Sequence, residues 1–486
     1  MFPVSRRDFL RGTGVAALGT ILPLTGSWAA GGDVVTLRAE TRQLEIDGRA
    51  ATVFGLRQRD GRLGLTAKVG EDFAVRLENA LAEPTSIHWH GLTPPWRQDG
   101  VSGVSQDPLP PATSQDYRFP LTRAGSFWMH SHEGLQEQLL LAAPLIVEEA
   151  SPRDEQDVVV MLHDFSFRAP DEILAALKAA PAMGGHDMSM SGMDHGSMPG
   201  MSGAMMDGMA MSGGGMAMDV NDVEFDAYLA NDRTLDDPEQ IMVERGGRVR
   251  LRIINAAAST GFTVDLGSLD GSLIAVDGIP IAPVTGRRFP IATAQRLDIR
   301  LELPRDGMAV PILALREGAP QRTGILLCPP GAAIKAISSR GDSAGPILDL
   351  ALERRLRSLE PLAPRPVDRA LTLALTGGMA GYRWGLEASS GPGPLPAKVG
   401  ERIEIAMVNR TMMAHPMHLH GHSFQVVAID GQRMAGALRD TVLVPPNTTV
   451  TIAFDANNPG HWAFHCHLLY HMVAGMMTTL AYEGVT

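Results

Sequence analysis

The chain has 486 residues, of which 44% are hydrophobic and 20% charged, and its formal net charge at pH 7 is −12. This composition is typical of a folded globular protein and excludes an intrinsically disordered chain, and the negative charge argues against nucleic-acid binding. A cationic substrate would suit this charge, but a solvated acidic surface is the simpler explanation. The length exceeds what one hydrophobic core supports and suits about three domains of roughly 100–150 residues.

The N-terminus has the features of an export signal. Residues 5–10 read S-R-R-D-F-L, an uncharged run covers residues 12–28, and two alanines follow. This pattern predicts a twin-arginine signal peptide over residues 1–30, recognised by the twin-arginine export machinery and directing the protein to the periplasm. A retained membrane anchor is the alternative. No later apolar stretch has the length of a membrane span, so we expect none in the mature chain.

Short segments of alternating polarity, separated by Gly, Pro and Asp turns, dominate the rest of the chain and predict β-sandwiches. The best helical candidate runs from Asp171 to Ala180, just after Pro170. Three segments share a glycine turn, an alternating strand and a final asparagine, and they run from Lys68 to Asn79, from Glu244 to Asn255 and from Lys398 to Asn409. Such repeats predict three copies of one β domain. We place the three domains at residues 31–150, 151–340 and 341–486.

Ten of the 15 histidines fall in four tight clusters. The clusters are His88 and His90; His130 and His132; His415, His418 and His420; and His465, His467 and His471. A His-x-His pair on a strand directs both imidazoles to one face of the sheet. A single pair of this kind is often a chance surface or core pair. Four clusters, one of them with an embedded cysteine, predict metal binding, and imidazole with thiolate suits copper.

The spacing of these clusters repeats between the first and third copies. Gly70 to His88 and Gly400 to His418 are both 18 residues, and Gly125 to His130 and Gly460 to His465 are both five. In the middle copy the positions equivalent to the first His pair hold Val264 and Leu266, so we expect a structural role there. Ser131 stands in the first copy where Cys466 stands in the third. Only the third copy can therefore carry a thiolate site.

Cys466 lies at the centre of the most informative motif, H-C-H-L-L-Y-H-M-V-A-G-M. Together with His471, Met476 and an upstream histidine, its thiolate would form the ligand set of a blue-copper electron-transfer site. The flanking His465 and His467 point away from that site, because adjacent strand residues face opposite sides. They can reach a second copper centre, which the short covalent path through Cys466 would connect to the first.

A methionine-rich tract interrupts the middle copy at residues 183–218, which contain 12 of the 26 methionines and no aromatic residue, Lys or Arg. Such a segment cannot build a packed core. Because thioethers select Cu(I), we expect it to recruit that ion. A low-complexity insertion without a role and a promiscuous hydrophobic surface are the alternatives. The candidate ligands are Met183, Met188, Met190, Met193, Met198 and Met201.

These motifs resemble the copper-binding signatures of the multicopper oxidases, over nearly all of the mature chain. The resemblance implies an all-β fold of three consecutive cupredoxin-like Greek-key β-sandwich domains and four copper ions. It implies a type 1 copper held by His415, Cys466, His471 and Met476. It implies a type 2 copper held by His88 and His418, and a type 3 pair held by His90, His130, His132, His420, His465 and His467.

Two further positions match the family more weakly. Asp99 corresponds to an acidic residue that assists proton delivery at the trinuclear copper cluster, although a plain Asp-Gly turn is an equal alternative. Met413 resembles a methionine that helps some cuprous oxidases bind substrate copper, and packing is its alternative. The chain departs from some cuprous oxidases at Tyr470, where they have an acidic residue, and in carrying its Met-rich insertion in the middle copy.

The resemblance implies an oxidase that takes electrons singly at the type 1 copper, passes them through Cys466, and reduces O₂ to two waters. The tract and the signal favour the copper-resistance branch, with Cu(I) as substrate. A laccase-like oxidase of phenols or other small organic donors is the first alternative. A copper-sequestering protein without turnover is the second. We expect a monomer.

The remaining histidines and the second cysteine are expected to be structural. Cys328 lies in an apolar run and is predicted to be an unpaired buried residue, so no disulfide is expected. His163 is predicted to be a satisfied core or turn residue. His422 and His461 are close to the clusters but break their spacing, which favours supporting roles.

Overall fold

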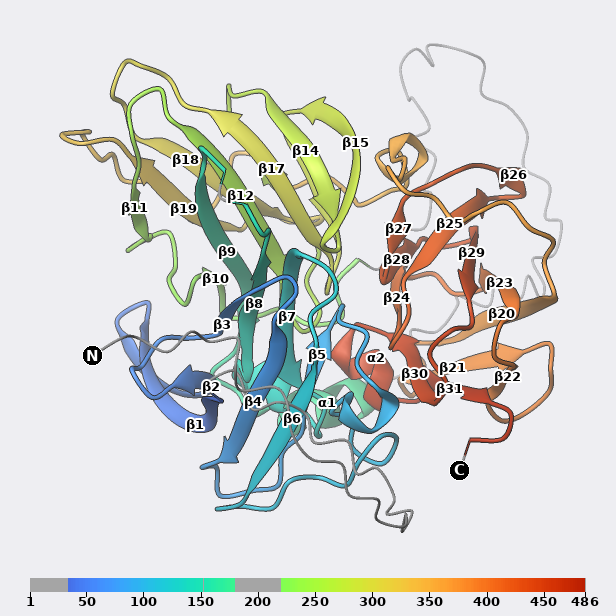
Figure 1. The fold of residues 1–486 in the computed structure, drawn as a ribbon. Coiled ribbons are helices and arrows are strands. Elements are labelled where there is room, and N and C mark those ends of the chain that lie inside the picture. Colours follow the sequence, from blue (N-terminus) through green and yellow to red (C-terminus); the bar gives the residue numbers. More distant parts are fainter. Residues whose placement is uncertain (1–33, 152, 180–219, 486) are drawn as a thin grey trace, which may run out of the picture. The chain divides into compact units, whose positions relative to one another are not determined.

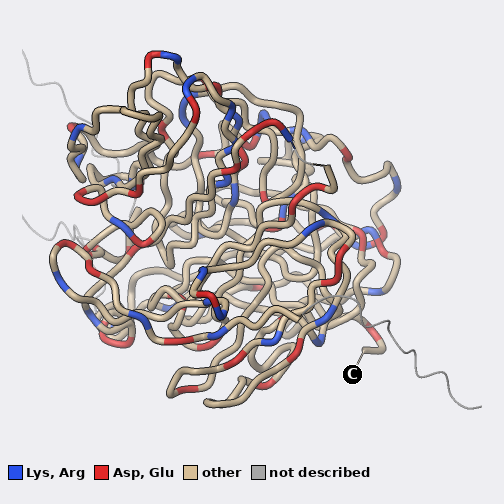
Figure 2. The backbone as a smooth tube through the Cα atoms, turned by 60° about the vertical axis from the view of Figure 1, so that its left-hand side comes forward, with Lys and Arg blue, Asp and Glu red and all other residues tan. Residues whose placement is uncertain are grey.

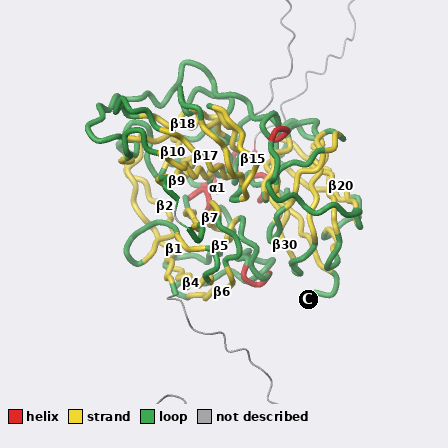
Figure 3. The backbone as a smooth tube through the Cα atoms, turned by 45° about the horizontal axis from the view of Figure 1, so that its top comes forward, coloured by secondary structure: helices red, strands yellow, loops and turns green. Residues whose placement is uncertain are grey.

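The structure of the protein is a computed structural model that describes residues 34–151, 153–179 and 220–485. Strands predominate strongly over helices in this part of the chain (Figure 3), which confirms the predicted all-β class. The signal peptide predicted for residues 1–30 and the Met-rich tract of residues 183–218 lie outside the described residues. Among the described residues, no helix is long and apolar enough to cross a bilayer.

The strands form three pairs of sheets, each pair from one continuous stretch of chain (Figure 1). The first sandwich joins the sheet β2-β1-β4-β6 to the sheet β3-β8-β7-β5. Its strands are β1 (Val35–Ile46), β2 (Arg49–Gln58), β3 (Leu65–Lys68), β4 (Asp72–Asn79), β5 (Ile87–His90), β6 (Ser114–Pro120), β7 (Gly125–Ser131) and β8 (Ala142–Glu148). Two 3₁₀ turns accompany them, η1 (Trp96–Gln98) and η2 (Gln136–Leu139).

The second sandwich joins the sheet β10-β9-β12-β17-β14-β15 to the sheet β11-β19-β18-β13-β16. Its strands are β9 (Gln156–Phe165), β10 (Ala227–Ala230), β11 (Gln240–Met242), β12 (Arg248–Asn255), β13 (Phe262–Asp265), β14 (Gly271–Val276), β15 (Ile279–Gly286), β16 (Arg288–Ile291), β17 (Arg296–Glu302), β18 (Val310–Arg316) and β19 (Arg322–Cys328). The predicted helix is present as α1 (Pro170–Ala179), where Pro170 begins the helix with its φ already suited to it.

The third sandwich joins the sheet β21-β20-β23-β29-β25-β26, to which β27 adds beside β25, to the sheet β22-β31-β30-β24-β28. Its strands are β20 (Arg369–Gly378), β21 (Arg383–Ala388), β22 (Leu395–Ala397), β23 (Arg402–Asn409), β24 (His415–Leu419), β25 (Phe424–Ile429), β26 (Gln432–Arg433), β27 (Leu438–Arg439), β28 (Thr441–Val444), β29 (Thr449–Asp455), β30 (His461–Cys466) and β31 (Met477–Tyr482). The 3₁₀ turn η3 (Glu353–Arg355) precedes it, and α2 (Leu469–Val473) connects β30 to β31.

The predicted repeat has a common topology in all three sandwiches. The strand after each glycine turn, β4, β12 or β23, pairs in parallel with the strand of its sheet that comes first in the chain, β1, β9 or β20. All three repeat strands end at the predicted asparagine. The side-chain oxygens of Asn79, Asn255 and Asn409 each accept a hydrogen bond from the backbone N–H two residues later. Their amides donate to two carbonyls each, which closes the turn that leads toward the next strand.

The sandwiches are filled by the inward-facing residues of their two sheets. Phe73, Trp89 and Tyr117 lie in the apolar core of the first sandwich, and one continuous apolar cluster extends through the second and third. Acidic and basic residues are interspersed along the described chain (Figure 2). The domain boundaries themselves stay a prediction.

Candidate metal centres

Strand register brings the predicted histidines together within each sandwich. His88 on β5 lies directly opposite His130 on β7, and His418 on β24 lies directly opposite His465 on β30. Directly opposite residues share one face of an antiparallel pair, so each sandwich presents its imidazoles on one side. In the second sandwich the equivalent register pairs Val264 with Ala314. That pair is apolar and buried, which explains why the middle copy contributes no imidazole.

The imidazoles of the first and third sandwiches face one another. The ring centroids of His88 and His420 are 3.9 Å apart, and those of His90 and His418 are 3.8 Å apart. Nε2 of His465 lies 3.0 Å from Nε2 of His420 and 3.3 Å from Nε2 of His132. Eight buried or nearly buried rings form this group, which we call the eight-histidine cluster: His88, His90, His130, His132, His418, His420, His465 and His467.

The free ring nitrogens of the cluster test whether these residues suit a metal. Five buried nitrogens have no hydrogen-bond partner among the described residues: Nε2 of His88, His130, His418 and His467, and Nδ1 of His90. Leaving a buried polar nitrogen unpaired costs about 1–3 kcal/mol, so five in one place point to missing partners of another kind. Burial lowers the pKa of most of these imidazoles, to about 4 for His465. Neutral imidazoles with lone pairs facing one another fit copper ions.

The opposite ring nitrogens are anchored to the protein, as metal-binding histidines require. Nδ1 of His88 donates to the carbonyl of Asp99 (3.0 Å), and Nδ1 of His420 donates to Oδ2 of the same residue (2.9 Å). Asp99, predicted to lie near the cluster, is thus buried between a histidine of the first sandwich and one of the third. Its role in proton delivery remains a proposal.

A second acidic residue beside the cluster escaped the sequence analysis. Glu137 in η2 is buried, and its carboxylate lies 2.8 Å from Nδ1 of His130 and 3.8 Å from Nδ1 of His467. Burial, with a smaller contribution from Asp164, raises the pKa of Glu137 well above its ordinary value. Tyr470, which stands where some relatives have an acid, instead hydrogen-bonds Gln138 (3.4 Å). No sequence motif marks Glu137, because its contact with the imidazoles depends on how η2 packs against β7.

The predicted type 1 residues form a separate buried group. Cys466 Sγ lies 3.6 Å from Nδ1 of His415 and 3.8 Å from Nδ1 of His471, and those two nitrogens are 3.1 Å apart. Met476 is fully buried, and its backbone bonds to both Cys466 and His471. Burial raises the pKa of the Cys466 thiol. A cation would therefore have to replace its proton when it binds.

The H-C-H motif links the two groups as its alternation predicts. Cys466 faces His415 and His471, while the rings of its neighbours His465 and His467 belong to the eight-histidine cluster. Nδ1 of His465 donates to the carbonyl of Cys466 (2.9 Å), which adds a hydrogen bond to the covalent connection. Electrons could thus pass from one group to the other over one residue of backbone.

The outer nitrogens of the two type 1 histidines are bound by residues that the sequence did not single out. Nε2 of His415 lies 2.7 Å from the hydroxyl of Thr411. Nε2 of His471 donates to Oδ2 of Asp222 (2.7 Å), which also accepts from the hydroxyl of Tyr382. Asp222 comes from the second sandwich, a few residues after the Met-rich tract. Its position just after the Met-rich tract is the only feature of the sequence that marks Asp222.

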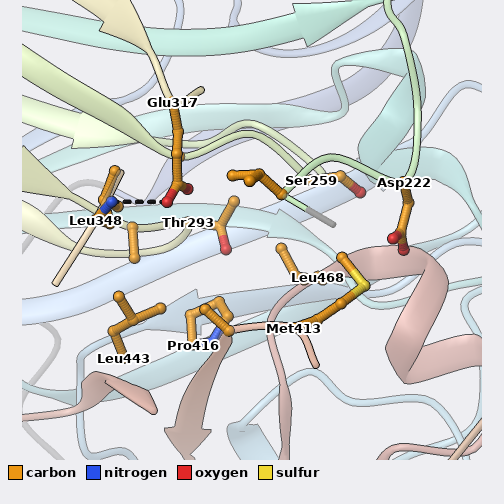
Figure 4. Close-up of a pocket in the computed structure, with 13 residues that line it drawn as sticks. Asp222, Ser259, Thr293, Glu317, Leu348, Met413, Pro416, Leu443 and Leu468 are labelled. Carbon is orange, nitrogen blue, oxygen red and sulfur yellow. Dashed lines mark hydrogen bonds between the residues drawn. The ribbon is translucent and has the colours of Figure 1, made fainter. Parts of the chain in front are cut away.

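A cavity lies beside Asp222, and its lining residues come from the second and third sandwiches (Figure 4). It leaves about 30 Å³ for the centres of water-sized molecules. The Met413 sulfur lies on the side where Asp222 is, and Glu317 lies at the other end. Oδ1 of Asp222 and the hydroxyls of Ser259 and Thr293 are buried and have no hydrogen-bond partner among the residues that the structure describes. The described lining residues include the carboxyl groups of Asp222 and Glu317 and no Lys or Arg.

Glu317 should make the stability of the protein depend on pH. Burial raises its pKa to about 7, while the backbone N–H of Leu348 opposes that rise. The charged form is disfavoured on folding, so the stabilisation is present below the ordinary pKa of 4.5 and is lost as the pH rises through about 7. We expect Glu317→Gln to match the wild type at pH 4 and to be more stable at pH 8 by about 1–3 kcal/mol.

Thermal unfolding of the copper-free protein at both pH values measures this difference. Glu302→Gln is the matched control, because Glu302 is exposed on β17. A melting-temperature gain at pH 8 that also occurs at pH 4, or that the control reproduces, would contradict the assignment to Glu317.

Three histidines and Cys328 lie outside the candidate centres. The prediction that His163 is satisfied is wrong. It is buried on β9, but neither ring nitrogen has a partner among the described residues, and burial lowers its pKa to about 4. His422 bonds the carbonyl of His420 and the hydroxyl of Tyr482. His461 bonds the carbonyl of Val485. Cys328 is buried at the end of β19.

Comparisons with known proteins agree with this architecture. Three multicopper oxidase family models match the chain, at residues 43–152, 158–309 and 364–484. The chain is 31% identical over 439 residues to multicopper oxidase MmcO of Mycobacterium tuberculosis, covering 86% of this chain and 81% of that protein. It is 27% identical over 587 residues to a copper resistance protein A homolog of Pseudomonas syringae pv. tomato, covering 99% of each.

Solved structures show the same fold. A multi-copper oxidase from Pseudomonas thermotolerans aligns over 93% of this chain and all of its own, with a TM-score of 0.67 and 24% identity. Lac15 from a marine microbial metagenome covers 92% of this chain and all of its own, with a TM-score of 0.63 and 28% identity. The chain belongs to the multicopper oxidases. It is a copper-containing oxidoreductase that uses O₂ as its electron acceptor.

Proposed function

We propose that the protein is a periplasmic cuprous oxidase, which couples one-electron oxidation of Cu(I) to four-electron reduction of O₂ to water in copper tolerance. The observation that carries the proposal is the small cavity lined by the Met413 thioether and by the carboxyl group of Asp222, which accepts a hydrogen bond from the outer nitrogen of His471. Relatives named copper resistance protein A support the role in tolerance. The twin-arginine pattern supports export to the periplasm. The proposal also includes three domains, at residues 31–150, 151–340 and 341–486, and a monomeric protein.

The proposed resident copper ions number four: one type 1 ion, one type 2 ion and a pair of type 3 ions. His415, Cys466, His471 and Met476 would hold the type 1 ion, and His88 and His418 the type 2 ion. His90, His130, His132, His420, His465 and His467 would hold the type 3 pair. Bound there, copper would supply one-electron transfer at the first centre and O₂ reduction at the other three ions.

The chain's own residues would organise each part of the reaction. The Met413 thioether suits Cu(I), and the Asp222 carboxylate suits the charge that grows when the ion is oxidised. Because Asp222 also accepts the N–H of His471, the substrate and a type 1 ligand share one residue. At the other centre, the buried carboxyls of Asp99 and Glu137 lie within hydrogen-bonding distance of proposed ligands, where they can hold protons that water formation consumes.

The size of the cavity favours a metal ion over an aromatic donor. A space of about 30 Å³ for the centres of water-sized molecules admits an ion or a few waters. Ligand sites for organic molecules of drug size usually occupy about 300–1,000 Å³. Met412, next to Met413, is 48% exposed, so one thioether lies at the surface beside the one that lines the cavity.

The test compares Cu(I) with a phenol as electron donor. Asp222→Asn and Met413→Leu should each lower kcat/KM for Cu(I) by about 10–100-fold, as expected for losing a contact to a charged group worth about 1.5–3 kcal/mol. Turnover of the phenol should stay within about twofold in Met413→Leu, because a ring of that size does not enter the cavity. In Asp222→Asn it should fall as well, but by less than turnover of Cu(I), because Asp222 also accepts the N–H of the proposed type 1 ligand His471. Met407→Leu, in the core of the third sandwich, is the control for methionine replacement.

Deleting residues 183–218 adds a second arm to the same measurement of O₂ consumption. If Cu(I) turnover drops on deletion while phenol turnover rises or holds, the tract recruits the substrate. If Cu(I) turnover is poor and insensitive to all these changes while phenols react well, the protein is a laccase-like oxidase. Copper binding without O₂ consumption from either donor would favour sequestration.

A further inference from the structure

The second sandwich supplies none of the twelve proposed copper ligands, yet it reaches the eight-histidine cluster through one arginine. Arg296, the first residue of β17, is fully buried. Its guanidinium donates to both carboxylate oxygens of Asp440, at 2.7 Å and 2.5 Å. Its Nε donates to the carbonyl of Ser126 (3.2 Å). Ser126 is on β7 of the first sandwich, and Asp440 directly precedes β28 of the third. One side chain therefore connects all three sandwiches beside the cluster.

Asp440 in turn anchors two histidines of the cluster. Nε2 of His90 lies 3.2 Å from its Oδ1, and Nδ1 of His418 donates to its carbonyl (2.8 Å). Each ring is left with a buried nitrogen that has no hydrogen-bond partner in the described part of the chain, Nδ1 of His90 and Nε2 of His418. The direction in which both lone pairs point thus depends on the position of Asp440.

Asp99 makes the corresponding contacts on the other side of the cluster. Its carbonyl accepts from His88 of its own sandwich, and its carboxylate accepts from His420 of the opposite one. Asp440 likewise uses its carbonyl for His418 of its own sandwich and its carboxylate for His90 of the opposite one. Both aspartates follow the pseudo-symmetry, and Asp440 is in addition held by the bidentate guanidinium of Arg296.

The glycines that follow the two His-x-His pairs show how this asymmetry is built. Gly91 has φ +89°, and a Cβ there would lie 2.4 Å from Nη2 of Arg296 and 2.9 Å from Oδ2 of Asp440. A Cβ at the equivalent Gly421 would instead lie 2.3 Å from the ring of Trp462. The same motif position therefore makes room for an ion pair on one side and for an indole on the other.

We propose that Arg296 is a positioning residue for the trinuclear copper cluster. By holding the Asp440 carboxylate with two parallel hydrogen bonds, it fixes His90 and His418 and makes the copper-free second sandwich part of the metal site. A bidentate guanidinium–carboxylate pair sets direction as well as charge. The inference rests on the ligand assignment in the proposed function and is independent of whether Cu(I) or a phenol is the substrate.

The test is a chelator titration of copper-loaded Arg296→Gln, followed by the electron paramagnetic resonance of the type 2 copper and by the blue absorption of the type 1 copper. Loss of a residue that orients metal-binding histidines typically lowers metal affinity about 10–100-fold. We expect trinuclear copper to be removed at about tenfold lower chelator concentration, with an altered type 2 spectrum. The blue absorption should be unchanged, because Arg296 has no contact with Cys466, His415 or His471 among the described residues.

Arg252→Gln is the matched control. Arg252 on β12 is also fully buried, and it bonds Ser126 Oγ (3.1 Å) and Asp157 (2.9 Å) without a contact to a proposed ligand or its anchor. It should behave as the wild type does. Arg296→Lys keeps the charge and loses the paired geometry, so it should lie between the wild type and Arg296→Gln, and it carries the test if the glutamine variant does not fold.

Two results would overturn the proposal: Arg296 variants with the wild-type type 2 spectrum and chelator midpoint, or an Arg252→Gln variant that loses trinuclear copper to the same extent. A wild-type protein that lacks type 2 and type 3 signals at full copper loading would contradict the ligand assignment instead. The two failures are therefore distinguishable in one experiment.

Discussion

Cys466→Ser is expected to abolish O₂ consumption with Cu(I) and with phenols alike. A hydroxyl is a poor ligand for a soft copper ion. The substitution removes the proposed type 1 thiolate, which is also the atom through which the type 1 copper would connect to His465 and His467. A loss of about 4 kcal/mol of transition-state stabilisation already lowers turnover roughly a thousandfold, and we expect at least that. The blue absorption should disappear, while the type 2 resonance remains.

The second cysteine provides the control for this experiment. Cys328→Ala removes a buried thiol whose sulfur hydrogen-bonds only the carbonyl of Leu326 (3.8 Å) among the described residues. It should keep the blue absorption and turnover of the wild type. Substantial turnover in Cys466→Ser would show that electrons reach the eight-histidine cluster by another path and would refute the role of the H-C-H motif.

Gly100→Ala should be the most damaging small substitution beside the cluster. Gly100 follows Asp99 with φ +80°, and a Cβ there would lie 1.7 Å from the carbonyl oxygen of Ile87, the residue before His88. Backbone must move to relieve that overlap, because no flexible side chain is involved. We expect a loss of about 3 kcal/mol or more in stability and a type 2 copper that is bound at least tenfold more weakly.

Gly103→Ala is the control, since Gly103 lies in the same loop with φ +71° and a Cβ there would meet nothing within 4 Å. It should cost only about 1 kcal/mol, from the left-handed backbone conformation. Calorimetric melting and chelator titration of the two variants measure the difference. Equal effects would mean that backbone conformation alone, and not the approach to Ile87, governs this loop.

Some features could be read from local sequence because each depends on residues close together in the chain. Strand alternation separates Cys466 from its two histidine neighbours, whatever the rest of the fold does. The repeat from each glycine turn to Asn79, Asn255 or Asn409 predicted three strands that end where the structure ends them. The same count of residues from glycine to histidine indicated that the first and third copies hold the imidazoles and that the second does not.

Other features arise only from contacts between distant segments. Asp222 and His471 are 249 residues apart in the chain, and Arg296 and Asp440 are 144 apart. No periodicity or motif relates such positions, because their approach is set by how the sandwiches pack. The position of Glu137 beside the imidazoles also depends on packing, in this case that of η2 against β7. His163 was expected to be satisfied because buried histidines usually are, and the structure leaves its ring unpaired.

The sequence by itself determined the family, the all-β fold and which histidines and cysteine lie together, since strand period and motif spacing control the face on which each side chain lies. Tertiary structure decided what surrounds those side chains: which aspartates hold the outer ring nitrogens, which arginine holds Asp440, and how small and how acidic the cavity beside His471 is. These properties depend on burial and on distances between sandwiches. Both arise only when residues hundreds of positions apart are packed against one another.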